Sequence, residues 1–325
     1  MRSTSAAVAM AYTGTVIGAG FASGQEIWQF FSRFGYWGGW GIALACLGFM
    51  VIGRLALERG RGGTREFGAL LASAYPPWAA AVGEGLTAAF LAIGIVVVVA
   101  GGGAALSYFG IAPLAGKLLT LVLVVGIATR GGRAVTAANS AVVPYLILVT
   151  LSVALFYPAR PQVLPHLSVS SPWALSAVLY VSYNLFTAVM VLLALGPRLP
   201  SGRATWRAAG IAAGLLGLLA FAEHSVLLRL PQIGDLPMLA AAHSIHAGLG
   251  ALFAASLWLA LMTTGIGGAF ALGQRFGKPR LWWLLLTIFL TPLSFKTLVG
   301  LLYPVMGSLA VLLWLPLFIT PTRRE

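Results

Sequence analysis

Long apolar stretches recur along the whole chain, separated by short segments that carry most of the charged residues. A helix needs about 20 residues to cross a bilayer core of about 30 Å, and this length criterion predicts ten membrane-spanning segments. Their expected limits are 5–34, 37–57, 77–108, 112–129, 133–157, 172–196, 204–229, 245–273, 281–297 and 300–320. The loop from Pro231 to His243 is long enough to hold a short helix of its own. We therefore expect an all-α, polytopic membrane protein.

The positions of the positively charged residues test this count, because lysine and arginine collect in the cytoplasmic loops of membrane proteins. With the N-terminus inside, 15 of the 20 cations fall at cytoplasmic positions. These are Arg2, Arg54, Arg59, Arg61, Arg65, Arg130, Arg133, Arg198, Arg203, Arg207, Arg275, Lys278, Arg280, Arg323 and Arg324. The pattern predicts that both termini lie in the cytoplasm.

Composition excludes several classes of protein. Hydrophobic residues make up 59% of the 325 residues and charged residues only 8%, with a mean hydropathy of +0.94, which is far from the soluble globular class. The net charge of +13 is spread over short loops, so it reports topology and does not predict a nucleic-acid partner. A single cysteine, Cys46, excludes an internal disulfide and a cysteine-based metal cluster.

The ten segments divide into two halves of similar length, 5–157 and 172–320, within a single transmembrane domain that covers 1–325. With five segments each, the halves have opposite orientations, which is the pattern of an inverted repeat. In transporters built this way, a broken helix at the same place in each half marks the binding site. We expect these breaks at Gly18–Gly20 in the first segment and at 180–184 in the sixth.

The stretch from Gly14 to Glu26 is polar and rich in glycine, although it lies inside the first apolar segment. At this depth, broken backbone and ionisable groups survive only where they line a cavity or a protein interior. Gly18, Ala19 and Gly20 would expose amides at the start of a half-helix, and such amides favour an anion. The alternative is a small-residue packing face. Ser23 and Glu26 follow directly, which favours a ligand site.

Glu26 has three possible roles: a structural carboxyl bonded to another helix, a counter-charge for an amine-bearing substrate, or a proton-coupling group. The sequence does not separate them. Near the outer end of the seventh segment, Glu223, His224 and Arg229 are expected to be solvated or to form a local ion pair.

The stretch from Gly14 to Glu26, read as GTVIGAGFASGQE, and the following Ile27 to Phe31 resemble the signature of the YkvI-like bacterial membrane proteins. These are relatives of the amino acid–polyamine–organocation transporters, which share the LeuT-type fold of five plus five inverted helices. The local match covers about 20 residues, and the rest of the chain agrees mainly in topology. The resemblance implies a transporter in the bacterial cytoplasmic membrane, with no cofactor.

The same resemblance implies a sodium site and a substrate cavity. In sodium-coupled members of this fold, carbonyls beside the first-helix break and a carbonyl and two hydroxyls of segment eight hold the ion. Carried over, the ligands are Gly14, Ile17, Ala260, Thr263 and Thr264. Proton-coupled relatives place a lysine of segment five there, whereas this chain offers Asn139 and Ser140. Tyr180, Ser182, Tyr183 and Asn184 would line the cavity opposite Gly18–Gly20, and Phe21 would act as an apolar wall or gate.

A secondary transporter for an amino acid or a related small amine or carboxylate, with sodium as the possible coupling ion, is therefore the leading hypothesis. Proton coupling and a ligand-sensing receptor on the same fold remain open. An intramembrane enzyme is the least favoured, because the four histidines are scattered and His243 and His246 have no evident third ligand.

Overall fold

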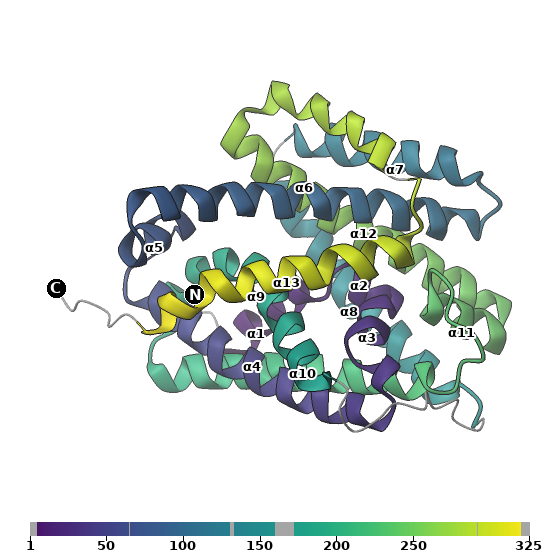
Figure 1. The fold of residues 1–325 in the computed structure, drawn as a ribbon. Coiled ribbons are helices and arrows are strands. Elements are labelled where there is room, and N and C mark those ends of the chain that lie inside the picture. The colour runs from purple at the N-terminus through teal and green to yellow at the C-terminus, as the bar shows by residue number, and fades with distance from the viewer. Residues whose placement is uncertain (1–4, 65, 131–132, 160–171, 291, 320–325) are drawn as a thin grey trace.

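The computed structural model describes residues 5–64, 66–130, 133–159, 172–290 and 292–319, and all the regular structure in these ranges is helical (Figure 1). The longer helices are α4 (Tyr36–Arg61), α6 (Pro77–Ser107), α7 (Pro113–Ala128), α8 (Arg133–Phe156), α9 (Trp173–Leu195), α10 (Gly202–Leu227), α12 (Ala247–Phe276) and α13 (Phe295–Ile319). Within the described ranges, five stretches are long and apolar enough to cross a membrane: α4, α6, α9 with its extension η2 (Gly196–Arg198), α10 and α12. The expectation of an all-α, multi-pass membrane protein is confirmed by these helices.

The first apolar segment is divided into short pieces: α1 (Ser5–Val16), α2 (Ala19–Ser23), α3 (Gln25–Phe30) and the 3₁₀ turn η1 (Ser32–Phe34). Gly18 is extended, with φ −96° and ψ −171°, so the chain leaves the helix between α1 and α2. Gly24 separates α2 from α3 with a φ of +81°, a conformation that favours glycine because it has no Cβ. The chain therefore changes direction twice within the stretch from Gly14 to Glu26.

The break expected at 180–184 is wrong, because α9 is one continuous helix from Trp173 to Leu195. This stretch contains no glycine or proline, and the side chains of Ser182 and Asn184 bond the helix itself. The Ser182 hydroxyl donates to the Val178 carbonyl at 2.8 Å, and the Asn184 amide donates to the Tyr180 carbonyl at 3.0 Å. Such bonds to the carbonyl one turn back are compatible with a continuous helix.

The ninth predicted segment, 281–297, is not one α-helix. Lys278–Leu290 forms a 3₁₀ helix, η3, and α13 begins at Phe295, five residues before the predicted start of the tenth segment. Pro292, which lacks an amide hydrogen, lies between them. Two short helices are added at the ends of the long ones: α5 (Phe67–Ala74), which was not predicted, and α11 (Pro237–Ile245), which lies in the loop expected to hold a short helix.

The short helices α1 to α3 lie in the middle of the bundle (Figure 1). Helix α1 packs against α9 and α10, while α2 contacts α12, α11 and α6. Helix α4 packs along both α9 and α10, and α6 packs along α12 and α7. The largest fully buried side chains include Tyr12, Phe21 and Phe30 of these short helices and Tyr180 of α9. The glycine-rich stretch is therefore enclosed by the longer helices.

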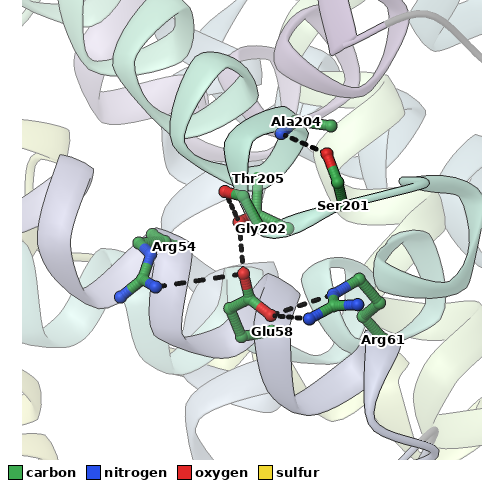
Figure 2. Close-up of polar contacts among 7 residues, drawn as sticks. All are labelled: Arg54, Glu58, Arg61, Ser201, Gly202, Ala204 and Thr205. Carbon is green, nitrogen blue, oxygen red and sulfur yellow. Dashed lines mark hydrogen bonds and ion pairs between the residues drawn. The ribbon is translucent and has the colours of Figure 1, made fainter.

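A polar junction fixes the end of α4 to the start of α10 (Figure 2). The Thr205 hydroxyl and the Arg61 Nε donate to the Glu58 carboxylate at 2.6 Å and 2.9 Å, and Ser201 caps α10 by accepting the amide of Ala204 at 3.3 Å. Arg54 lies farther off, with 4.0 Å between its Nη2 and Glu58 Oε1. The junction holds two long helices together at one end of the molecule.

Replacing Thr205 by valine is expected to lower the free energy of unfolding by about 1–3 kcal/mol, because Glu58 then loses a buried donor and keeps its charge. Chemical unfolding in detergent measures the change. Arg54→Gln is the control, and it should cost at most about 1 kcal/mol, since a partly exposed ion pair contributes little. Equal losses in both variants would show that the Thr205 bond has no special weight.

Candidate substrate and ion site

A cavity of about 410 Å³ lies in the centre of the bundle. Its walls come from the end of α1, from Glu26 in α3, and from the middle parts of α6, α8, α9, α12 and α13. Helical segments that are far apart in the sequence therefore meet at the interruption between α1 and α2.

Nine of the residues expected to bind substrate or ion line this one cavity. They are Gly14, Ile17, Gly18, Glu26, Tyr183, Asn184, Ala260, Thr263 and Thr264. The five expected sodium ligands are all among them. Residues from the first segment, the sixth and the eighth are thus brought to one place, although more than 150 positions separate the first segment's residues from those of the sixth.

The end of α1 explains how backbone oxygens become available there. In a continuous helix the Gly18 amide would bond the Gly14 carbonyl, but it bonds the Val16 carbonyl instead, at 2.8 Å. Likewise the Phe21 amide, which would bond the Ile17 carbonyl, bonds the carboxyl of Glu26. Both carbonyls expected to hold a cation have therefore lost the helical donor that would have occupied them.

The hydroxyls of segment eight are engaged in the helix. Thr263 Oγ1 and Thr264 Oγ1 both donate to the Ala260 carbonyl, at 2.9 Å and 3.0 Å. Membrane threonines commonly make such bonds. Because a hydroxyl that donates its hydrogen keeps its lone pairs, both oxygens can still act as ligands toward the cavity.

Glu26 is the only charged residue among the lining residues that the structure describes. Its side chain is 3% exposed, and its Oε2 has no hydrogen-bond partner within the described part of the chain. Tyr183 and Asn184 of α9 approach the same carboxyl. A buried carboxyl with a free oxygen, facing a cavity without a basic residue among its described lining, is suited to a positively charged ligand.

Gly20 lies directly beneath this carboxyl. A Cβ at position 20 would lie 2.6 Å from Glu26 Cγ and would overlap Oε1. Gly20 therefore provides the space in which Glu26 folds back over the start of α2, where its carboxyl meets the amide of Phe21.

At Gly18 this arrangement corrects the expectation that Gly18–Gly20 presents free amides to an anion, while the amides of Ala19 and Gly20 stay a prediction. The Gly18 amide is bonded to Val16, and the amide of Phe21 faces the carboxyl of Glu26. The positive end of α2 therefore already has a carboxylate of the chain itself. The side chain of Ala19 lies outside the described residues.

Several expected substrate contacts do not line the cavity. Ser23 is buried and donates to the Gly20 carbonyl at 2.8 Å, which makes it part of the turn. Phe21 and Tyr180 pack together around a much smaller space of about 10 Å³. Ser182 bonds its own helix. These four side chains are therefore part of the structure around the cavity and do not belong to its lining.

Other residues of the cavity wall were not predicted from the sequence, and Tyr303 is the most prominent of them. Its ring packs at a tilt against the ring of Tyr183, with 4.8 Å between the centroids, and Thr187, Met190 and Met306 also line the cavity. Tyr303 precedes Pro304 in the middle of an apolar segment. A tyrosine hydroxyl at such a position was the feature of the sequence that could have indicated a cavity residue. Thr187 lies one turn beyond Tyr183 on the same face of α9.

The junction between α2 and α3 contacts the loop before α11 and α11 itself. The Gln25 side-chain amide donates to the Gly234 carbonyl in the loop before α11, and a Cβ on Gly24 would lie 2.6 Å from Met238 Cγ. The Lys296 ammonium, at the start of α13, donates to the Ile233 carbonyl of the same loop at 2.7 Å. The loop and α11 thus cover the junction between α2 and α3.

A second cavity of about 610 Å³ lies next to the central one, and Leu91, Met190 and Ala271 line both. The second cavity is bordered by the ion pair between Arg275 and Glu84, with 3.0 Å between Nη2 and Oε2. Phe67 and Gly68 of α5 also line it, so the neighbouring cavity lies at the end of the molecule where α5 begins.

Two curated bacterial proteins are similar in sequence over most of the chain. The uncharacterized membrane protein YkvI of Bacillus subtilis (strain 168) is 28% identical over 280 residues, which cover 82% of this chain and 80% of YkvI. The uncharacterized protein YyaD of the same strain is 26% identical over 324 residues, which cover 95% of this chain and 94% of YyaD. No protein-family model matches the chain.

Solved structures of transporters share the fold. A mutant of the Eremococcus coleocola manganese transporter superposes with a TM-score of 0.63 at 18% identity, over 96% of this chain and 78% of the transporter. An inward-facing conformation of Mhp1 gives a TM-score of 0.63 at 13% identity, over 95% of this chain and 74% of Mhp1. At these identities the likeness establishes the fold alone. Sequence and fold together confirm the resemblance, and the chain is a relative of the YkvI-like membrane proteins with a LeuT-type transporter fold.

Proposed function

We propose that this protein is a secondary active transporter that moves an amino acid or a related small amine across the membrane by alternating access. The observation that carries the proposal is the central cavity, in which Glu26 is the only charged residue of the described lining and keeps one unpartnered oxygen. An ammonium group is the ligand that best matches such a carboxyl. A substrate with only a carboxylate fits less well, because the amide of Phe21 already donates its hydrogen bond to the carboxyl of Glu26.

The proposed topology has ten spans in the bacterial cytoplasmic membrane, with both termini inside and with repeats 5–157 and 172–320 related by inversion. Helix packing supports this relation. Exchange of the two repeats turns the contact of α4 with α9 into that of α10 with α1, and turns the contact of α8 with α12 into that of α13 with α6; all four are present. In this topology the second cavity, which borders α5, lies on the cytoplasmic side of the central one.

Sodium is the proposed coupling ion. Support comes from the five neutral oxygens expected as ligands, whose residues all line the central cavity, with the Gly14 and Ile17 carbonyls released from their helical donors. Neutral oxygen ligands suit a hard cation. The side chains of Asn139 and Ser140, at the position where proton-coupled relatives carry lysine, lie outside the described residues.

Uptake into proteoliposomes tests the function. Thermal unfolding of the purified protein with a panel of amino acids, amines and carboxylates, with and without sodium, first identifies a ligand. Accumulation of that ligand under an imposed sodium gradient is the expected result. Accumulation under a proton gradient alone would replace sodium by protons, equilibration without accumulation would indicate a channel or uniporter, and binding without uptake would indicate a receptor.

Replacing Thr263 by alanine together with Thr264 by valine is expected to abolish the sodium-dependent rise in unfolding temperature, because two of five ligands are removed. Differential scanning fluorimetry in sodium against potassium measures this rise. Thr187→Val is the control, since Thr187 lines the same cavity without belonging to the ligand set. An unchanged sodium effect in the double variant would refute this ion site.

A further inference from the structure

The polar and the apolar residues of the central cavity are separated along its walls. On α9, Tyr183 and Asn184 line the cavity at one level, and Met190 and Val191 line it nearly two turns further on. At about 1.5 Å per residue, these two levels are about 10 Å apart along the helix axis. The cavity therefore has a polar end and an apolar end.

Two other helices agree with this order. On α12 the lining begins with Ala260, Thr263 and Thr264 and ends at Ala271, and on α6 it includes Leu91. Leu91 and Ala271, like Met190, also line the second cavity. The apolar end is therefore the end next to the second cavity.

Glu26 belongs to the polar end. Phe30, one turn after Glu26 on α3, stacks on the ring of Tyr183 with 5.6 Å between the centroids. The Tyr183 ring also contacts that of Tyr303, and both tyrosines line the cavity with Glu26. An ammonium group thus meets a carboxylate and two aromatic rings at this end, and all of these attract a cation.

The apolar end has no partner for a second charge among its described lining. Its side chains include Phe90, Leu91, Met190 and Met306, none of which is charged. An unpaired charge is costly in such surroundings, whereas each methylene group buried there strengthens binding about fourfold. The apolar end is therefore suited to the hydrocarbon part of a ligand.

We propose that the cargo is a monoamine with an aromatic or aliphatic body and without a carboxylate. Its ammonium group binds Glu26 beside the rings of Tyr183 and Tyr303, and its body extends toward Met190 and Met306, which select for apolar cargo. The inference narrows the proposed function and rests on it, because Glu26 is again the residue that holds the ammonium group.

Two related classes of cargo differ from a monoamine by one charged group. An α-amino acid adds a carboxylate, for which the described lining offers no basic side chain, so it would need the amides of Ala19 and Gly20. A diamine adds a second ammonium group. The acids in the wall of the second cavity are Glu66 and Glu84, and Glu84 is paired with Arg275.

Titration calorimetry of the purified full-length protein compares the three classes. The monoamines are ethylamine, butylamine, hexylamine and phenethylamine, and the counterparts with a further charge are phenylalanine and hexamethylenediamine. We expect affinity to rise about fourfold per methylene group from ethylamine to hexylamine. Phenethylamine should bind about tenfold or more tightly than phenylalanine, and hexylamine should exceed hexamethylenediamine by a similar factor, because the added charge is left unpaired.

Two results of this titration would overturn the inference. Equal affinities of ethylamine and hexylamine, or no binding of either, would show that the body does not occupy the apolar end. Binding of phenylalanine or hexamethylenediamine as tight as that of the matching monoamine would show that the site accepts the further charge. The wild-type protein alone decides these points.

Met190→Glu tests where the body lies, with Met190→Gln as the control of equal size and no charge. Hexamethylenediamine should bind about tenfold or more tightly to Met190→Glu than to Met190→Gln, because a carboxylate then meets its second ammonium group. Equal affinities would place the body elsewhere. Glu66→Gln is a further control, and loss of diamine binding in it would identify the cargo as a diamine held by the second cavity.

Uptake into proteoliposomes separates a failure of this inference from a failure of the transport proposal. Accumulation of phenethylamine or hexylamine is the expected result. Accumulation of phenylalanine or hexamethylenediamine instead would refute the monoamine and leave a transporter. Binding of the monoamines without accumulation would support the cargo site and refute transport.

Discussion

Glu26→Gln is expected to abolish binding of amine ligands while the protein still folds. The substitution keeps the size of the side chain and removes the charge, so an ammonium group entering the cavity would be desolvated without a counter-charge. Removing one partner of a buried charge pair costs about 2–5 kcal/mol, which corresponds to a loss of roughly 30-fold or more in affinity. Titration calorimetry with the amine found in the ligand panel, and its uptake into proteoliposomes, measure the loss.

Glu66→Gln is the matched control for this experiment as well. Glu66 is an acid in the wall of the neighbouring second cavity, but it is exposed to solvent, where screening weakens its effect. We expect this variant to bind and transport almost normally. If Glu26→Gln transported at the wild-type rate, Glu26 would be a structural carboxyl, and the cargo would be recognised by neutral groups of the cavity.

The first segment was the most informative part of the sequence. Four glycines and a carboxylate inside an apolar run are incompatible with lipid contact, and this physical conflict predicted the position of the cavity wall. Polar residues in the sixth segment also predicted a break, but α9 is continuous there. Polar residues alone do not break a helix when their side chains bond the preceding turn, as Ser182 and Asn184 do.

Tertiary packing decided what the sequence left open. Whether Gly20 offers an amide to a ligand or space to a side chain depends on where Glu26 folds, and no local pattern encodes that position. Glu223 was misjudged for a similar reason. It lies near the end of a predicted span, where solvent is expected, and only the packing of α10 within the bundle reveals that it is completely buried.

Gly20→Ala is expected to eliminate amine binding as completely as Glu26→Gln, although it adds only one methyl group and no charge. The new Cβ would overlap Glu26 Oε1, so the carboxyl must leave its place over the Phe21 amide or α2 must shift. Gly94→Ala is the matched control, because Gly94 also lines the cavity but has open space where its Cβ would lie. Calorimetry should find normal binding in Gly94→Ala and none in Gly20→Ala, with both proteins eluting as folded, monodisperse species. Normal binding in Gly20→Ala would mean that Glu26 recognises its ligand from another position, and the geometry proposed for the substrate site would be wrong.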